Sequence, residues 1–197
     1  MAGQMKVQFA NAGEVISKLN GLKADSEKVI QSTMKDIAGR APAWVSQEVT
    51  KVYGIKKAEI KGSATKGSAG TVKLSGTVVD SYTLTYRGRV LTPTHFGMTP
   101  KVRPGGGRRY TVKASIHKGE KKVLGSRVFL GQSGSEGTMA IPFQREGTAR
   151  LPIQAVKTVS VPQMIDNEKV NKAIYERIAQ EGIKRLNHHV DRYFAKH

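Results

Sequence analysis

Cysteine is absent from this chain of 197 residues. The sequence therefore excludes a disulfide framework, a thiolate nucleophile and a cysteine-ligated metal site, which fits a reducing cytoplasm. Long apolar runs are missing as well, since none approaches the roughly 18 residues of a membrane-spanning helix. The segment from Met1 to Ala12 has one lysine and no apolar signal-peptide region. We expect neither a membrane helix nor a secretory signal.

Acidic residues are scarce: 15 Asp and Glu stand against 33 Lys and Arg, and the formal net charge is +18. Residues 1–60 carry nine basic and six acidic residues, residues 61–150 carry sixteen and four, and residues 151–197 carry eight and five. The excess in the middle attracts polyanions and supplies sequence-independent attraction to a nucleic-acid backbone. An acidic protein partner, or solubility alone, would account for the same charge.

Recognisable catalytic patterns are also lacking. The sequence has neither a G-x-S-x-G elbow nor an H-E-x-x-H motif. Ser115 and Lys118 match S-x-x-K, but they fall at the end of a predicted strand and not in a helical turn. The sparse carboxylates of the middle region disfavour magnesium-dependent phosphoryl transfer. We expect the chain not to be an enzyme and to bind no cofactor.

The histidines do not form a metal-binding pattern. His188 and His189 are adjacent on a predicted helix, so their side chains diverge by about 100°. His95 and His117 lie in the strand region with no paired carboxylate nearby in the sequence. We therefore expect no metal site.

The first quarter of the chain has helical periodicity. Apolar residues recur at helical spacing from about Asn11 to Val52. Asn20-Gly21 interrupts the pattern, and we expect a second break between Gly39 and Pro42. This pattern predicts a kinked helical hairpin or one long broken helix. Trp44, the single tryptophan, is predicted to anchor the core.

The middle of the chain alternates with a period of two. We predict about five antiparallel strands in a meander, with one face buried and the other polar and basic. They fall at TVKLSGTVV from Thr71, YTLTY from Tyr82, Tyr110 to Ile116, Val123 to Leu130 and Thr138 to Phe143. Residues 61–70 and 92–109 are predicted to form flexible loops.

The second of these loops contains three glycines between basic residues. Their backbone freedom and the flanking charge would suit a phosphate, but the spacing matches neither a Walker loop nor a dinucleotide fingerprint. We interpret the segment as a basic loop that contacts DNA or a neighbouring subunit. The residues predicted to face DNA or another polyanion are Lys101, Arg103, Arg108, Arg109, Lys113, Lys121 and Lys122.

Three of the seven prolines lie between Ile141 and Met164, at Pro142, Pro152 and Pro162. Proline lacks a backbone donor and pushes the preceding residue toward extended geometry. The segment is therefore predicted to be an edge strand or an extended arm lying on another surface, although an ordinary connection within one domain fits the same pattern. A long helix over about 166–195, capped by Asp166 or Asn167, completes a single α+β domain of residues 1–197.

Several of these segments resemble the minor tail protein Z family of long-tailed bacteriophages and prophages, also described as tail completion or neck proteins. The likeness covers most of the chain, including VYGIKKAEIK, LTPTHFGMTPK and FQREGTARLPIQAVKTVSVPQM. It is most specific in Arg145-Glu146-Gly147, in Arg150-Leu151-Pro152-Ile153 and in Ser160-Val161-Pro162-Gln163-Met164.

The resemblance implies a structural protein of the virion tail, assembled in the host cytoplasm, that acts in tail completion and head–tail joining. Such a protein would form a homo-oligomeric ring at the head-proximal end of the tail, next to the tail terminator, tail tube or head–tail connector, and would surround or position DNA. We expect an intersubunit arm that includes Arg145, Glu146, Arg150, Leu151, Pro152, Ile153, Val161, Pro162 and Met164. The alternative is a basic, sequence-independent nucleic-acid-binding protein that is not built into a ring.

Overall fold

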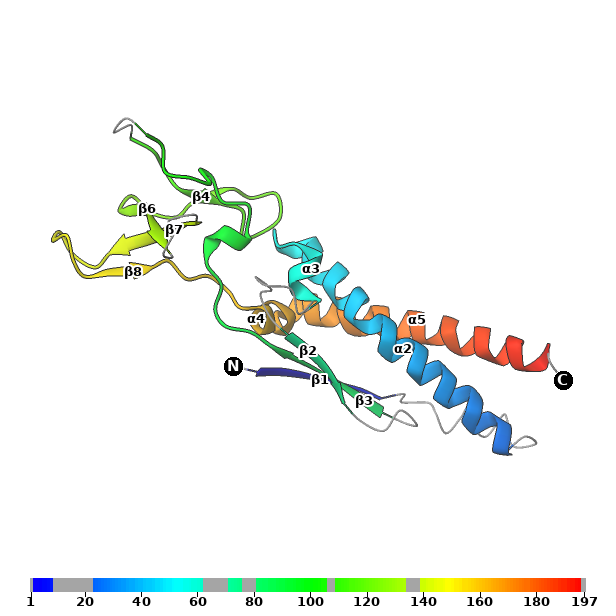
Figure 1. The fold of residues 1–197 in the computed structure, drawn as a ribbon. Coiled ribbons are helices and arrows are strands. Elements are labelled where there is room, and N and C mark those ends of the chain that lie inside the picture. Colours follow the sequence, from blue (N-terminus) through cyan, green and yellow to red (C-terminus); the bar gives the residue numbers. More distant parts are fainter. Residues whose placement is uncertain are drawn as a thin grey trace.

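The computed structural model describes residues 2–8, 23–61, 71–75, 81–105, 109–133 and 139–195. It confirms the α+β class, with a long helix near the N-terminus, small antiparallel sheets and a long C-terminal helix (Figure 1). In chain order the elements are β1 (Ala2–Gln8), α2 (Lys23–Val52), α3 (Lys57–Ile60), β2 (Thr71–Ser75), β3 (Ser81–Arg87), η1 (Pro93–His95), β4 (Lys113–Ala114), β5 (Lys122–Val123), β6 (Val128–Ser133), β7 (Met139–Arg145), β8 (Ile153–Ala155), α4 (Val161–Asp166) and α5 (Glu168–Phe194).

The two long helices, α2 and α5, lie antiparallel side by side (Figure 1). Helix α2 is continuous from Lys23 to Val52, so the break expected between Gly39 and Pro42 is wrong. A proline inside a helix destabilises it by roughly 3 kcal/mol, whereas burial of one large aliphatic side chain stabilises the folded state by about 2 kcal/mol. Ile37, Val45 and Val49 on this helix are all fully buried, which outweighs the local cost. The expected break at Asn20-Gly21 lies outside the described residues.

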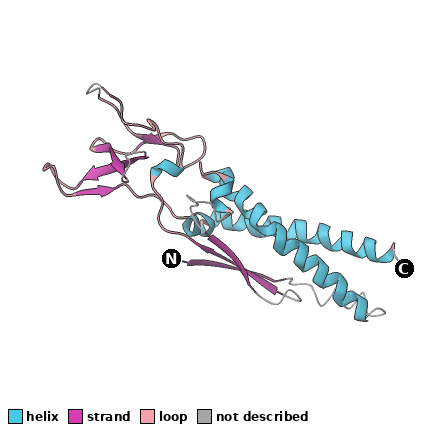
Figure 2. Cartoon of the chain, in the orientation of Figure 1, coloured by secondary structure: helices cyan, strands magenta, loops and turns pink. Residues whose placement is uncertain are grey.

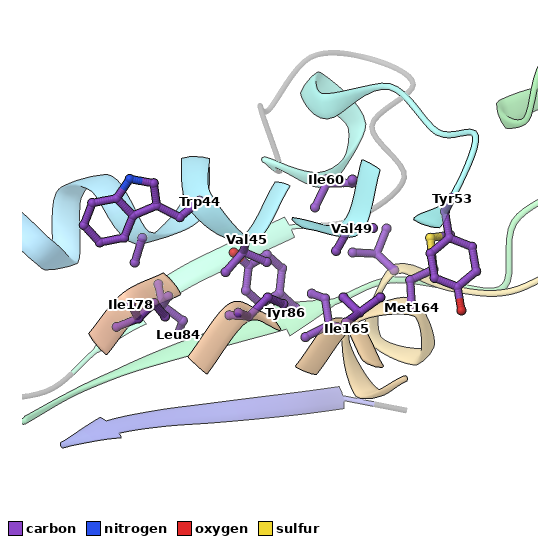
Figure 3. Packing of buried hydrophobic residues seen from close by; sticks show 14 of the residues in the cluster. Trp44, Val45, Val49, Tyr53, Ile60, Leu84, Tyr86, Met164, Ile165 and Ile178 are labelled. Carbon is purple, nitrogen blue, oxygen red and sulfur yellow. The ribbon is translucent and has the colours of Figure 1, made fainter. Parts of the chain in front are cut away.

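The first sheet has the strand order β1-β3-β2 and is antiparallel throughout. The central strand β3 contributes the buried side chains of Tyr82, Leu84 and Tyr86 to the main core. This core also contains Trp44 of α2, as predicted, and Ile178 of α5 (Figure 3). The sheet and the two helices thus enclose one hydrophobic cluster.

The other five strands form two further small sheets, β4-β5 and β6-β7-β8, at the end of the molecule opposite the C-terminus (Figure 2). We call residues 98–156 the β lobe. A second, smaller hydrophobic cluster fills it, formed by Met98, Val112, Val128 and Leu130 with Tyr110, Leu124, Ala140 and Val156 packed around them. The strands expected in one meander are therefore divided among three sheets.

Backbone hydrogen bonds join the β lobe to the helical part. The amide of Gly54 donates to the carbonyl of Ile116 over 2.9 Å, and the amide of Lys118 donates to the carbonyl of Val52 over 2.8 Å. A Cβ atom on Gly54 would lie 2.0 Å from the carbonyl oxygen of Ser115. Glycine is therefore required at this crossing of two backbones.

The predicted arm of residues 141–164 is only partly extended. Its last part forms helix α4, in which Val161, Pro162 and Met164 are buried, so these three residues cannot serve as an exposed intersubunit contact. The helix forms because Ser160 and Gln163 make a reciprocal capping box. Pro162 stands in the first turn, where its missing amide hydrogen is not needed.

The two predicted loops and the last helix have different outcomes. Residues 62–70 lie outside the described part of the chain. The first half of the 92–109 loop is packed and not flexible: it forms η1, and Phe96 and Met98 are buried because each enters one of the two cores. The C-terminal helix is confirmed as α5, and Asn167 caps it by accepting a hydrogen bond from the amide of Val170.

Candidate polyanion-binding surface

Two exposed lysines lie on one face of the short β4–β5 sheet in the β lobe. Thr99 and Lys113 pair in antiparallel fashion through two backbone hydrogen bonds of 2.8 Å, and Lys113 pairs in turn with Val123 of β5. The Nζ atom of Lys121 donates to Oγ1 of Thr99 over 2.8 Å. Because side chains alternate along a strand, Lys113 and Lys121 lie on the same exposed face.

The opposite face of the same strands is apolar. Met98 and Val112 are buried, and Leu124 packs beside them in the core of the β lobe. The amide of Leu124 donates to the carbonyl of Val112 over 3.0 Å, which fixes the register of the two segments. The alternation predicted from the sequence for Tyr110 to Ile116 is therefore present, with Val112 and Ala114 buried and Lys113 exposed between them.

Lys122 is exposed but has an acidic partner. Its Nζ atom lies 2.8 Å from Oε2 of Glu120, and the hydrogen bond from Lys122 lowers the pKa of this carboxyl. At neutral pH the pair largely cancels its own charge. Lys122 therefore contributes less to a polyanion-binding surface than Lys113 or Lys121 does.

Three other predicted basic residues lie on the chain segments that adjoin this face. Lys101, Arg103 and Arg109 are exposed, and their segments run from β4 away from the helices (Figure 1). None of these three forms an ion pair with another described residue. Arg108 lies outside the described residues. The exposed cations Lys101, Arg103, Arg109, Lys113 and Lys121 together constitute the basic face.

A second exposed feature is the β7–β8 hairpin, whose tip, residues 146–152, points away from the helices (Figure 1). Leu151 and Ile153 are 66% and 38% exposed, although both are large apolar residues. Pro152, Glu146 and Arg150 are exposed as well. The amide of Glu146 donates to the carbonyl of Pro152 over 3.3 Å, and the side chain of Gln154 donates to the Glu146 carboxylate. The hairpin is therefore held in shape while its apolar tip has no cover within the described residues.

Arg145 is the last residue of β7 before the hairpin tip, pairs with Ile153 of β8 and is half-buried. Its guanidinium carbon is 5.3 Å from the ring centroid of Phe129, and the Phe129 ring stacks at 6.2 Å on that of Phe143. An open depression of about 380 Å³ adjoins the stack. Arg145 is thus a packing element of the hairpin and not a freely projecting charge.

One pairing has no signal in the sequence. His95 Nδ1 lies 2.5 Å from Oε2 of Glu59, although 36 positions separate the two residues. The pair ties η1 to α3. His117 stacks on the ring of Tyr53 at 5.2 Å. Nowhere in the described part of the chain do three His, Asp or Glu side chains gather in a way that would hold a metal ion.

No helix in the described ranges is both long and apolar enough to cross a membrane. Comparisons of the chain with protein-family models, with curated proteins and with solved structures found no match. The candidate functional surfaces of the described chain are the basic face and the exposed apolar residues of the β7–β8 hairpin, and both lie on the β lobe.

Proposed function

We propose that the chain is a structural phage tail protein that acts in tail completion and head–tail joining, as a ring subunit at the head-proximal end of the tail. The observation that carries this proposal is the presence of two chemically different exposed surfaces on one lobe. One is the basic face with Lys113 and Lys121, and the other is the β7–β8 hairpin, with Leu151 at its tip and Ile153 at the start of β8.

A ring of identical subunits needs two different patches, because each head-to-tail contact joins one patch to the other. The hairpin suits the role of one patch. Strand β8 is the edge of its sheet, so its backbone groups are available for pairing with a neighbouring chain. The exposed apolar side chains of the hairpin would add to the stability of such a contact, because the neighbouring chain would bury them. The hairpin also contains two of the segments in which the resemblance to the minor tail protein Z family is most specific.

The basic face suits the surface that meets DNA. Exposed lysines and arginines neutralise backbone phosphates without reading sequence, which is what a ring surrounding a passing DNA end requires. Repetition of the face around a ring would multiply weak contacts through effective concentration. A single subunit is then expected to bind DNA weakly and the assembled ring strongly.

The test of the hairpin is the double variant Leu151→Ser, Ile153→Ser. It removes the exposed apolar side chains without touching the core, whereas deletion of the whole predicted arm would remove Val161 and Met164 and unfold the chain. We expect this variant to fold but not to assemble into rings. Negative-stain electron microscopy of the purified protein, by itself and mixed with tail tubes, checks assembly. The matched control is Ile183→Ser, which replaces another exposed apolar residue, 58% exposed, on α5. Rings formed by the double variant as readily as by the unaltered protein would refute the hairpin contact.

The basic face also favours the alternative function, a free nucleic-acid-binding protein. The two functions predict different DNA binding by the monomer. A free binder should retain DNA at about 0.15 M salt with a steep salt dependence, while a ring subunit should gain binding only on assembly. Measuring DNA binding against salt for the assembly-deficient hairpin variant separates them, with Lys113→Gln, Lys121→Gln as the variant that should lower the salt slope.

A further inference from the structure

A cluster of cations lines a groove between residues of α2 and the C-terminal half of α5. The C-terminal half of α5 lies far from the β lobe (Figure 1). The groove has a volume of about 390 Å³. Its lining is polar or charged throughout: Ser32, Lys35, Asp36, Arg40, Arg185, His188, His189 and Arg192. We call it the distal groove.

Helical spacing explains why these residues meet. On α5, positions 185, 188, 189 and 192 follow the i, i+3, i+4, i+7 pattern of a single helix face. On α2, positions 32, 36 and 40 are four residues apart and form a matching stripe. The antiparallel packing of the two helices then brings the stripes together, with Asp36 opposite Arg185 and His189.

The groove holds more positive charge than it can neutralise. Four Lys and Arg residues surround one carboxylate, that of Asp36, whereas burial lowers the pKa of His189, so this histidine adds no charge at neutral pH. Burial raises the pKa of Asp36, but the hydrogen bond and charge of Arg40 and the charge of Arg185 outweigh this effect and lower it, so the carboxylate is ionised at neutral pH. Lys35 and Arg192 are exposed and form no ion pair with any described residue.

Two buried nitrogen atoms in the groove lack a hydrogen-bond partner, and that of the arginine is always a donor. Nε of Arg185 and Nε2 of His189 are buried from solvent and have no hydrogen-bond partner among the described residues. Oxygen Oδ2 of Asp36 lies 3.8 Å from Nε2 of His189 and 3.8 Å from Nη1 of Arg185, too far for a hydrogen bond. A buried unsatisfied donor costs about 1–3 kcal/mol. An acceptor bound in the groove would remove this cost.

We propose that the distal groove binds a phosphate group. A phosphate supplies several acceptor oxygens and a charge of −1 in a nucleic-acid backbone or of nearly −2 in a free phosphate, which matches an unpaired buried donor beside an excess of cations. Guanidinium groups, of which the groove has three, fit phosphate oxygens in a planar, two-pronged geometry. The phosphate comes either from a free small molecule or from a nucleic-acid backbone. This site is independent of the basic face and of the assembly role.

The test measures thermal stability of the full chain with added phosphate or pyrophosphate, against sodium chloride at the same ionic strength. Binding to the folded state raises Tm. We expect a rise with a Kd of about 1 mM or tighter, and at least about a tenfold weaker Kd for Lys35→Gln, Arg192→Gln, two exposed positions whose replacement leaves the core intact. Arg185→Gln should weaken binding as well. The control is Lys184→Gln, an exposed lysine of the same helix paired with Glu181 outside the groove.

A second arm adds short duplex DNA at the same concentration of phosphate groups. If the groove variants lose DNA binding and the unaltered protein responds little to free phosphate, the ligand is a nucleic-acid phosphate. If the unaltered protein responds to free phosphate and the groove variants still bind DNA, the ligand is a small molecule. The proposal is overturned if neither ligand raises Tm above the salt control, or if the Lys184→Gln control loses binding as much as the groove variants do.

Discussion

The carboxylate of Glu48 on α2 lies 2.6 Å from the guanidinium of Arg177 on α5, and its second oxygen lies 2.5 Å from Nζ of Lys51. Glu48 is only 4% exposed. This contact joins residues 129 positions apart and fixes the register of the helix pair. The main core and the distal groove both depend on that register.

The first prediction concerns this ion pair. Glu48→Ala leaves Arg177 without its partner in a half-buried position, and breaking such a pair costs about 3 kcal/mol. Urea unfolding should show a lower midpoint at an unchanged m-value. Glu181→Ala, which removes the half-buried carboxylate paired with the exposed Lys184 on the same helix, should change the midpoint much less. Equal effects of the two substitutions would contradict a special role for Glu48.

The pH dependence of stability follows from the same carboxylate. Burial raises the pKa of Glu48, but hydrogen bonds from Lys51 and Arg177 outweigh it and lower the pKa below the usual 4.5. A lowered folded-state pKa gives stability that is fully present above the unfolded value and is lost as pH falls through the folded one. The free energy of unfolding should therefore decline below about pH 4.5. Glu48→Gln should flatten this decline, and an unchanged slope would refute the assignment.

The crossing of backbones at Gly54 gives the third prediction. In Gly54→Ala the new Cβ would lie 2.0 Å from the Ser115 carbonyl oxygen, so the joint between α2 and the β lobe must open, at a cost of about 2–3 kcal/mol. Gly39→Ala is the matched control, because Gly39 lies within α2 with nothing within 4 Å of an added Cβ. The control should gain about 1 kcal/mol from helix propensity. Thermal unfolding of both variants tests the contrast in sign.

For two buried tyrosines on β3 we predict that removal of a polar group does not destabilise the protein. The hydroxyls of Tyr82 and Tyr86 have no hydrogen-bond partner within the described residues, and burial raises the pKa of both. Tyr82→Phe should therefore be neutral or stabilising, since it removes an unsatisfied polar group. In Tyr110→Phe the Leu130 amide loses an acceptor 2.9 Å away, and about 1 kcal/mol of stability is lost. A larger loss for Tyr82→Phe than for Tyr110→Phe would overturn this ranking.

Local patterns in the sequence predicted the elements whose burial follows a simple period. Val170, Ile174 and Ile178 are spaced by four, and all are buried on α5 beyond the predicted Asn167 cap. The alternation that predicted a basic outer face likewise places Lys113 outward and Val112 inward. In both cases one repeated spacing decides which side chains are buried.

Features that depend on contacts distant in the sequence could not be predicted. Pro42 was expected to break a helix because the local cost is visible in the sequence, whereas the burial that offsets it depends on α5. The pairs Glu48–Arg177 and His95–Glu59 join positions that no periodicity relates. The distal groove was missed for the same reason, since it requires the register of two helices from opposite ends of the chain.

The last prediction concerns the cap of helix α4, the end of the predicted arm that is buried in the structure. Ser160 is 4% exposed, its hydroxyl accepts from the Gln163 amide, and Gln163 Oε1 accepts from the Ser160 amide over 2.9 Å. Ser160→Ala should cost about 1 kcal/mol of monomer stability, and Ser160→Thr should retain most of it, because threonine also caps. An exposed arm that docks on a neighbouring subunit would behave differently: Ser160→Ala would leave monomer unfolding unchanged and weaken only assembly. Chemical denaturation of the monomeric hairpin variant, with and without Ser160→Ala, separates a capped core helix from a docking arm.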